Sequence, residues 1–228
     1  MLNQPQERPS VLFFDVNETL LDLSPLKHRI DEVLLTGGSA TQWFTTMLQY
    51  SLVLTVSEQY ESLADIGVAT LQMLGKSRDL AISTTDAKEI VGMMRTLPAH
   101  PDVPPALRQL KTMGFELVAL TNSSDAGVAA QLAHAQIDCC FDRHLSVETV
   151  RRFKPHRSVY LWAAEQVGHE PRNTMLVAAH GWDVAGAKWA GMQTAFLERP
   201  GQHLFPLGPM PDAHVSDLNA LVAHFKQC

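Results

Sequence analysis

Short apolar runs of strand length recur along the chain and alternate with stretches whose apolar residues follow helical spacing. The strand-like runs are Val11–Asp15, Glu116–Thr121, Thr174–Ala179 and Gln193–Leu197. The helix-like stretches lie at about 104–113, 124–135, 156–168 and 183–191. Strands that alternate with helices build a mostly parallel sheet through right-handed crossovers. The pattern therefore predicts an α/β fold, a Rossmann-like parallel sheet core with helices on both faces.

Residues 24–96 break this alternation, because they contain helix-like stretches without a convincing strand between them. The stretches are Ser24–Thr36, Thr41–Ser57, Tyr60–Leu74 and Asp86–Arg95. The proline-rich segment 98–105 then forms a stiff connection back to the sheet. We expect a core domain of residues 1–22 and 99–228, and a helical cap domain of residues 23–98 inserted after the first strand.

Composition and charge narrow the function classes. The 228 residues carry 18 Lys+Arg and 24 Asp+Glu, a net charge of −6 without a basic block, which argues against a nucleic-acid partner. No apolar run approaches the roughly 20 residues of a membrane span, and the polar start has no signal-peptide core. Two of the three cysteines, Cys139 and Cys140, are adjacent and are expected to be small buried hydrophobes. These features predict a soluble cytoplasmic protein with no membrane partner.

Polar side chains gather where the predicted strands end. Asp15 closes the first apolar run, Thr121 closes the second, and the segment 180–183 follows the third. Open parallel sheets place their chemistry at the carboxyl ends of the strands. A carboxylate held there can be oriented and shielded from water, so that it attacks an electrophilic carbon or phosphorus and forms a covalent ester.

Four motifs in order along the chain carry a family resemblance. They are Phe14-Asp-Val-Asn-Glu-Thr-Leu20, Leu120-Thr-Asn-Ser123, Phe153-Lys-Pro-His-Arg-Ser-Val-Tyr160 and Val177-Ala-Ala-His-Gly-Trp-Asp-Val-Ala-Gly-Ala187. Together they resemble the haloacid dehalogenase superfamily. Within it, Lys154-Pro155 and Trp182-Asp183 look most like the type II, or L-2-haloacid dehalogenase, branch. The resemblance extends from about residue 11 to residue 226.

The resemblance implies that Asp15 is the nucleophile. Thr19 and Thr121 would hydrogen-bond the Asp15 carboxylate and orient it, and Asn122 would help to position the reacting groups. Lys154 would keep Asp15 ionised and would offset the charge of an anionic substrate. The product of the first step would be a covalent ester, which water then hydrolyses.

Further motif residues would serve the second step and the substrate. Asp183 would pair with Lys154 or help to activate the hydrolytic water. His180 would be a neutral general base for ester hydrolysis, or a hydrogen-bonded loop histidine without a catalytic role. The expected substrate-contacting residues are Asn17, Phe44, Ser123, Tyr160 and Trp182.

Most members of the superfamily are magnesium-dependent phosphatases, and two positions separate this chain from them. The second aspartate of their first motif is Asn17 here, which has no proton to give to a leaving group. The metal-binding acid of their fourth motif falls on Ala179, where a magnesium ion would need an oxygen. We therefore expect no metal, no cofactor, and hydrolysis of a short 2-haloalkanoic acid to the 2-hydroxy acid. A magnesium-dependent phosphatase is the alternative.

The side chains that would face the substrate depart from the type II pattern. Phe44 stands where that branch carries an arginine on its second cap helix, while Glu18 takes a glycine position and His180 an asparagine position. Two further alternatives stay open: hydrolysis of another activated carbon centre, such as a strained-ring amino acid, and a binding protein that turns nothing over. Glu18 is expected to face solvent or to pair with a cap residue. The apolar Leu52-Val53-Leu54 surface would allow a homodimer through the cap helices, as is common among type II relatives.

Overall fold

A six-stranded parallel sheet forms the centre of the fold within residues 8–227, the part of the chain that the computed structural model describes. The strands are β1 (Val11–Phe14), β2 (Glu116–Thr121), β3 (Arg143–Ser146), β4 (Thr174–Ala178), β5 (Gln193–Leu197) and β6 (Ala213–Val215). They lie in the order β3-β2-β1-β4-β5-β6, and each neighbouring pair is parallel. The chain thus winds outward in both directions from β1, and ligands of such sheets bind at the point where the winding reverses.

The first strand occupies the most protected place in this sheet. Each residue of β1 is fully buried, as its unbroken Val-Leu-Phe-Phe run predicts for a strand covered on both faces. Phe14 is in register with Ala119 of β2 and Val177 of β4. The next backbone N–H, that of Asp15, still donates to Val177 O at 3.1 Å. Asp15 therefore leaves the sheet at the carboxyl edge, between the ends of β2 and β4.

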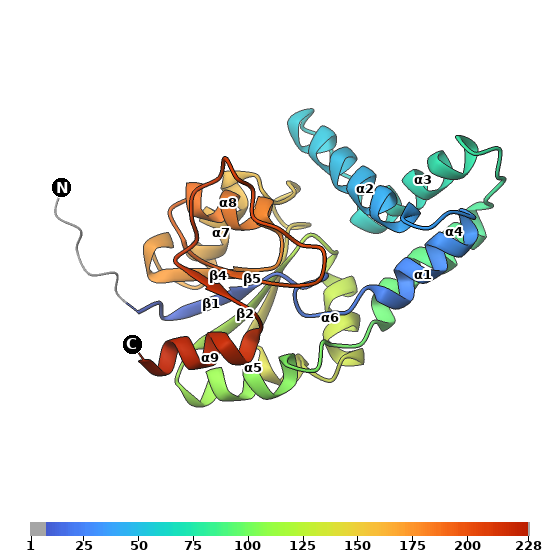
Figure 1. The fold of residues 1–228 in the computed structure, drawn as a ribbon. Helices are drawn as coiled ribbons and strands as arrows, with labels where there is room; N and C mark the ends of the chain where they lie inside the picture. Colours follow the sequence, from blue (N-terminus) through green and yellow to red (C-terminus); the bar gives the residue numbers. More distant parts are fainter. Residues whose placement is uncertain (1–7, 228) are drawn as a thin grey trace.

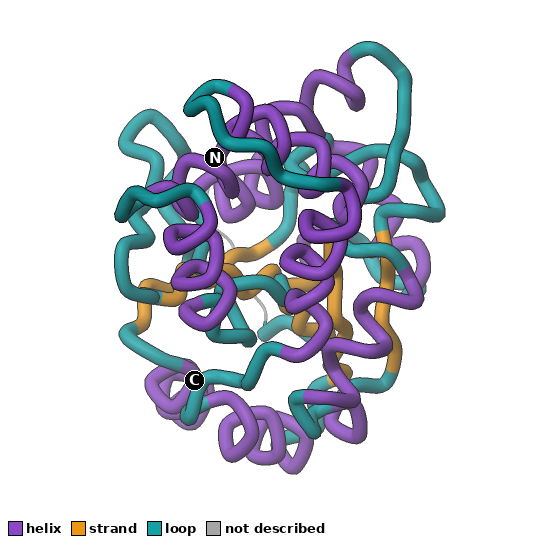
Figure 2. The backbone as a smooth tube through the Cα atoms, turned by 90° about the vertical axis from the view of Figure 1, so that its right-hand side faces the viewer, coloured by secondary structure: helices purple, strands orange, loops and turns teal. Residues whose placement is uncertain are grey.

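Helices cover both faces of the sheet, so the predicted fold class is confirmed. The core helices are α5 (Val103–Thr112), α6 (Asp125–His134), α7 (Arg157–Gln166), α8 (Gly181–Trp189) and α9 (Leu218–Gln227). Short 3₁₀ turns lie at η1 (Met93–Thr96), η2 (Asp138–Cys140) and η3 (Pro171–Asn173). Figure 1 shows α5 and α9 together on one side of the sheet and α7 and α8 on the other. Figure 2 shows the strands in the middle of the core with helices around them.

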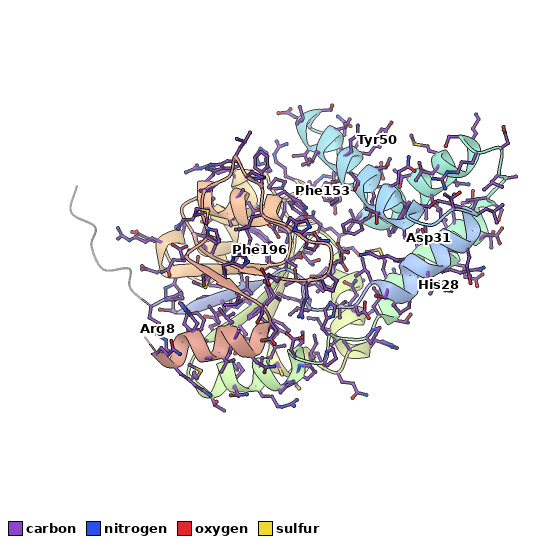
Figure 3. The ribbon with its side chains drawn as sticks, viewed as in Figure 1. Arg8, His28, Asp31, Tyr50, Phe153 and Phe196 are labelled. Carbon is purple, nitrogen blue, oxygen red and sulfur yellow. The ribbon has the colours of Figure 1, made fainter. Side chains whose placement is uncertain are left out.

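The segment after β1 forms a separate group of helices beside the sheet (Figure 1). They are α1 (Ser24–Val33), α2 (Ser39–Val56), α3 (Leu63–Lys76) and α4 (Thr84–Gly92). The Asp31 carboxylate, labelled in Figure 3, accepts hydrogen bonds from Gly38 N and Ala40 N and so fixes the turn between α1 and α2. The outgoing and returning chains meet where Asp22 N donates to Pro98 O at 2.9 Å. The helical character predicted for this segment is confirmed.

The structure also holds elements that the apolar pattern did not predict. The strands β3 and β6 form the two edges of the sheet, and the helix α9 follows β6. Edge strands are short and carry polar side chains toward water, so Arg143-His-Leu-Ser146 and Ala213-His-Val215 lack the long apolar run of a central strand. The expectation that both adjacent cysteines are buried is half right, because Cys140 is buried and Cys139 is exposed.

The outer surface of α2 is partly apolar. Leu52 and Val53 are 39% and 48% exposed, whereas Leu54 packs against the hydrophobic core. A homodimer through the cap helices stays a prediction. Among the described residues, none of the helices combines the length and the apolar character that crossing a bilayer requires.

A partly buried ion pair ties the loop after Asp15 to the rest of the core. Arg199 donates to both carboxylate oxygens of Asp102, at 2.9 and 3.1 Å, and to Thr19 O at 3.0 and 3.1 Å. Asp102 also accepts from Leu218 N, the first residue of α9. We expect Arg199→Ala to lower the free energy of unfolding by about 2 kcal/mol, because it removes the charged donor of a partly buried carboxylate and of the Thr19 carbonyl.

Urea unfolding followed by circular dichroism measures this loss. The matched control is Arg172→Ala, since Arg172 pairs with Glu170 at the surface, where the two side chains are 76% and 66% exposed. An exposed pair contributes about 0.5 kcal/mol or less. Equal effects of the two substitutions would contradict a structural role for Arg199.

Candidate active site

The carboxylate of Asp15 is held from three sides. Thr19 Oγ1 donates to Oδ2 at 2.7 Å, Lys154 Nζ donates to Oδ1 at 2.8 Å, and His180 Nδ1 lies 3.2 Å from Oδ2. Burial alone would raise the pKa of this carboxyl, but the Lys154 charge and the His180 hydrogen bond and charge outweigh burial and hold the pKa well below its ordinary value. Asp15 is therefore ionised at neutral pH, and its expected contacts with Thr19 and Lys154 are confirmed.

Lys154 bridges the two acidic residues of the site. Its ammonium, which is completely buried, donates to Asp15 Oδ1, to Asp183 Oδ2 at 2.6 Å and to Leu120 O at 3.0 Å. Burial opposes the charge, yet the two carboxylates outweigh it and raise the pKa of Lys154 above its ordinary value. All three protons of the ammonium are engaged, so Lys154 acts as a fixed cation and leaves no donor for a ligand. The expected pairing of Asp183 with Lys154 is confirmed.

His180 lies between two carboxylates. It follows β4 and contacts Asp15 through Nδ1, while its Nε2 lies 2.8 Å from Glu18 Oε2. Burial lowers the pKa of the ring, but the hydrogen bonds to Asp15 and Glu18 and their charges raise it to about 9. Because both ring nitrogens face carboxylates, the ring of the free protein is an imidazolium at neutral pH. The role of a neutral general base in ester hydrolysis stays a prediction.

Two aromatic rings enclose this imidazolium. Phe44 of α2 stacks on His180 with ring centroids 5.9 Å apart and planes 19° apart. Trp182 stacks on the ring with centroids 5.2 Å apart and planes 23° apart. The electron-rich faces of aromatic rings attract a cation, which adds to the charge that Asp15 and Glu18 stabilise. The residue at the expected arginine position thus contacts the site through His180.

Glu18 is the site residue that sequence reasoning missed. It is buried, and besides His180 its carboxylate accepts hydrogen bonds from Lys27 of α1 and from Gln202. The expectation of a solvent-facing side chain is wrong, while the alternative of a partner in the cap is confirmed by Lys27. Its φ of 61° lies in the left-handed region, which costs a non-glycine residue about 1 kcal/mol or more. The sequence did contain a signal for this role, because Glu18 occupies a glycine position of the family motif.

A cavity of about 700 Å³ opens beside these residues, between α2 and the loops of the core. Of the predicted site residues, Lys154, His180, Phe44 and Trp182 line it. The other described lining residues are Glu18, Lys27, Thr41, Thr45, Leu48, Gln49, Leu52, Pro155, Pro200, Gly201 and Gln202. The charged groups therefore form one end of a cavity whose other walls are mostly apolar.

Two predicted catalytic residues act on the backbone instead of on Asp15. Thr121 Oγ1 accepts a hydrogen bond from Ser123 N at 3.1 Å, so its expected contact with the Asp15 carboxylate is not among the hydrogen bonds of the described residues. The hydroxyl closes the turn after β2. Asn122 Oδ1 accepts from Lys154 N at 2.9 Å and so holds the segment that carries the lysine. Both residues position the loops around the site.

Three predicted substrate contacts lie away from the large cavity. Tyr160 is fully buried and donates its hydroxyl proton to Asp183 Oδ1 at 2.5 Å, so it orients that carboxylate and cannot reach a ligand. Asn17 Nδ2 donates to Ser123 Oγ, and Asn17 Oδ1 accepts from Gln131 Nε2. Among the described lining residues, Ser123 appears only at a second cavity of about 280 Å³, which is lined by α3 and α4 of the cap and by the start of α6.

The place where phosphatases of this superfamily hold a metal has a different donor set here. Ala179 contributes a methyl group, and its N–H donates to Thr19 Oγ1 at 3.0 Å. The oxygens of Asp15 and Asp183 that face each other are bridged by the Lys154 ammonium. The described residues contain no group of three or more His, Cys, Asp or Glu side chains arranged to hold a metal ion.

Comparison with known families agrees with this geometry. Residues 9–191 match the haloacid dehalogenase-like hydrolase family, and the chain belongs to that family. The predicted membership is thereby confirmed.

Individual relatives place the chain near one branch of the family. It is 27% identical over 215 residues to an (S)-2-haloacid dehalogenase of Pseudomonas sp. strain YL, which covers 93% of both chains. It is 29% identical over 213 residues to (S)-2-haloacid dehalogenase H-109 of Pseudomonas putida, covering 92% of this chain and 95% of the relative. The fold is similar to that of L-2-haloacid dehalogenase from Xanthobacter autotrophicus with chloropropionic acid covalently bound, with a TM-score of 0.87, 20% identity, and coverage of 96% and 98%.

The ionisation of His180 gives a direct test of the site. We expect its ring to titrate with a pKa of about 9, and Glu18→Gln to shift that pKa downward because one of the two carboxylates is lost. The raised pKa of His180 also stabilises the folded protein. This stabilisation is complete below pH 6.5, the ordinary pKa of histidine, and is lost as the pH rises through about 9. NMR of the His180 Cε1–H resonance, followed from neutral to alkaline pH, measures this pKa in the wild-type chain and in Glu18→Gln.

Glu58→Gln is the matched control for this titration. Glu58 also has a left-handed φ, of 58°, but its side chain is 80% exposed and lies outside the site. The Glu58→Gln substitution should leave the pKa of His180 unchanged. A wild-type His180 that titrates at or below 6.5 would contradict the imidazolium.

Proposed function

We propose that the protein hydrolyses 2-haloalkanoic acids to 2-hydroxy acids through a covalent ester on Asp15. The observation that carries this proposal is the ionised, buried Asp15 carboxylate, aimed from the carboxyl end of β1 and fixed by Thr19 and Lys154. The two curated relatives described above are named as 2-haloacid dehalogenases, and this supports the same substrate class for this chain.

In the first step Asp15 attacks the halogen-bearing carbon. Oδ2 accepts hydrogen bonds from two groups, Thr19 and His180, whereas Oδ1 accepts only that of Lys154 among the described residues. Oδ1 thus keeps a lone pair for the attack. The Oδ1–carbon bond forms as the carbon–halogen bond breaks, and the halide leaves with the bonding electron pair.

The substrate carboxylate needs a cation, and Phe44 supplies none. The protons of Lys154 are all engaged, and both ring nitrogens of His180 face protein carboxylates. Lys27 of α1 lines the cavity, and its side chain is 36% exposed while it pairs with Glu18. We assign the substrate carboxylate to Lys27, which lines the same cavity as the aromatic ring that replaces the arginine.

In the second step water hydrolyses the ester. Formation of the ester removes the negative charge of Asp15, so His180 loses one of the two carboxylates that raise its pKa, and it releases a proton to solvent. Glu18 then orients the neutral ring, and Nδ1 takes a proton from water that attacks the Asp15 carbonyl carbon. Collapse of the tetrahedral intermediate breaks the original ester bond, the alkoxide takes up a proton, and Asp15 returns to its ionised form.

The proposed reaction does not use a metal ion. Lys154 already supplies a positive charge between Asp15 and Asp183, and Ala179 offers no side-chain oxygen to a cation. The phosphatase alternative also requires a proton donor at position 17. There the Asn17 amide is bound to Ser123 and Gln131, so the residues present favour displacement at carbon.

Halide release from 2-bromopropionate in the presence of a chelator tests this function. We expect steady release by the wild-type chain and a loss of roughly a thousandfold or more in Asp15→Asn and Asp15→Ala, because the nucleophile is removed. Release that survives both substitutions would overturn the role of Asp15. Release of phosphate from phosphate esters only when magnesium is added would favour the phosphatase.

The remaining alternatives give different results in the same assay. A binding protein would bind 2-bromopropionate in calorimetry without forming any Asp15-dependent product. A hydrolase of strained-ring amino acids would open such a ring without releasing halide from any haloacid.

The second step has its own test in Glu18→Gln. With the carboxylate removed, His180 is a poorly oriented base, so the ester should form but hydrolyse roughly 100-fold more slowly. We expect a burst of halide equal to the enzyme concentration, followed by a slow phase, and an acid adduct on Asp15 in the intact mass spectrum. Glu58→Gln should show neither change. A Glu18→Gln chain without burst or adduct would show that Glu18 does not serve ester hydrolysis.

A further inference from the structure

The cavity beside Asp15 is larger than the proposed reaction requires. It has a volume of about 700 Å³ and is partly open to solvent, and cavities of roughly 300 to 1,000 Å³ hold ligands the size of drug molecules. A three-carbon haloacid would fill only a small part of that volume. The rest would hold water against walls that are mostly carbon.

One wall is a continuous face of α2. The residues Thr41, Phe44, Thr45, Leu48 and Leu52 recur at helical spacing and line the cavity. Leu52 lies eight residues after Phe44, about 12 Å further along the helix at 1.5 Å per residue. Because Phe44 stacks on His180, this face runs from the reactive end of the cavity outward.

The opposite wall comes from the core and is also apolar. It includes Pro155, Trp182 and Pro200, from three different loops or helix starts of the sheet domain. The charged groups, in contrast, gather at one end, around Glu18 and Lys27. The α2 wall also carries three uncharged polar side chains, Thr41, Thr45 and Gln49. The cavity therefore has a charged end for a reacting acid group and a largely apolar, uncharged length beyond it.

Helix packing does not explain the apolar residues of this face. A different face of α2, with Trp43, Met47 and Thr55, is the buried one. Trp43 Nε1 donates to Gly67 O of α3, and Thr55 Oγ1 accepts from Phe153 N of the core, which lies at the side of the core facing α2 (Figure 3). Leu52, in contrast, is 39% exposed. An apolar surface left open beside a reactive group marks a ligand-binding site.

We propose that the substrate is a 2-haloacid with an extended apolar tail, about as long as a hexyl group or longer, which lies along α2 against Trp182 and Pro200. This inference rests on the proposed function and names the substrate class within it. The acid group and the halogen-bearing carbon lie at the Lys27 and Asp15 end, and the tail covers Leu48 and Leu52. The loss of the cap arginine fits this arrangement, because Phe44 extends the apolar wall up to the reactive end.

A chain-length series tests the proposal with the full-length protein. Halide release is measured with 2-bromopropionate, 2-bromohexanoate and 2-bromooctanoate, which differ only in the tail. Burial of one methylene corresponds to a factor of about four in binding, so kcat/KM should rise by roughly threefold per methylene, most of it through a lower KM. A kcat/KM that stays flat or falls with chain length would overturn the proposal.

Filling the cavity should remove this preference. Leu48→Trp places a bulky ring in the path of the tail, and the ratio of kcat/KM for 2-bromooctanoate to that for 2-bromopropionate should fall by roughly tenfold or more. Met73→Trp is the control, since Met73 of α3 is 45% exposed and lines neither described cavity. It should leave both rates and their ratio unchanged. An unchanged ratio in Leu48→Trp would place the tail elsewhere and contradict the proposal.

A binding experiment separates this inference from the proposed function. Calorimetry of the wild-type chain with octanoate and with propionate, neither of which can react, reports on the cavity alone. Octanoate should bind at least roughly tenfold more tightly. If halide is released but longer tails improve neither kcat/KM nor binding, the dehalogenase function stands and the proposed long-tailed substrate is wrong. If octanoate binds more tightly but no bromoacid releases halide, the apolar binding site stands and the proposed dehalogenase function is wrong.

Discussion

The buried ammonium of Lys154 is the group around which the reactive edge of the sheet is organised. It joins Asp15, at the end of β1, to Asp183 in the first turn of α8, and it also binds a carbonyl at the end of β2. A lone buried ammonium would cost several kcal/mol, and two facing carboxylates without it would repel each other. Asn122 and Tyr160 hold the two ends of this bridge in place. The convergence of these elements therefore depends on one cation, which together with His180 also keeps Asp15 ionised.

The charges of the whole site are balanced before the reaction and unbalanced after the first step. Lys27, Lys154 and His180 face the carboxylates of Asp15, Glu18 and Asp183. In the proposed reaction, esterification of Asp15 leaves one positive charge in excess in a largely buried place, where it attracts the departing halide and the substrate carboxylate. The same event lowers the pKa of His180 when a base is needed. The imidazolium of the free protein and a basic role in ester hydrolysis are thus two states of one residue.

The sequence predicted the parts of this arrangement that follow from local pattern. Unbroken apolar runs revealed the central strands. Ordered motifs revealed Asp15, Thr19 and Asp183, which follow strand ends, and Lys154, which lies in the segment between β3 and α7. Contacts that depend on the direction of a side chain could not be predicted from the sequence. Thr121 turns its hydroxyl to a backbone N–H, and Glu18 turns inward to His180, although a strand-end threonine and a charged loop residue suggest the opposite. The edge strand β3 was missed because Arg143-His-Leu-Ser146 is short and lacks the long apolar run of a central strand.

Phe44 stands where the type II branch carries a cap arginine, and the positive charge beside it belongs to His180 of the core. A guanidinium on α2 would need hydrogen-bond partners in the cavity wall, and these would make that wall polar. Here His180 lies between Asp15 and Glu18 within the core, and Phe44 contacts it only through its ring face. The helix α2 then presents Phe44, Leu48 and Leu52 to the cavity without a charged side chain among them. In the proposed reaction, chemistry and substrate selection are thereby divided: the core carries the reacting charges, and α2 supplies an uncharged wall whose side chains can change without altering Asp15.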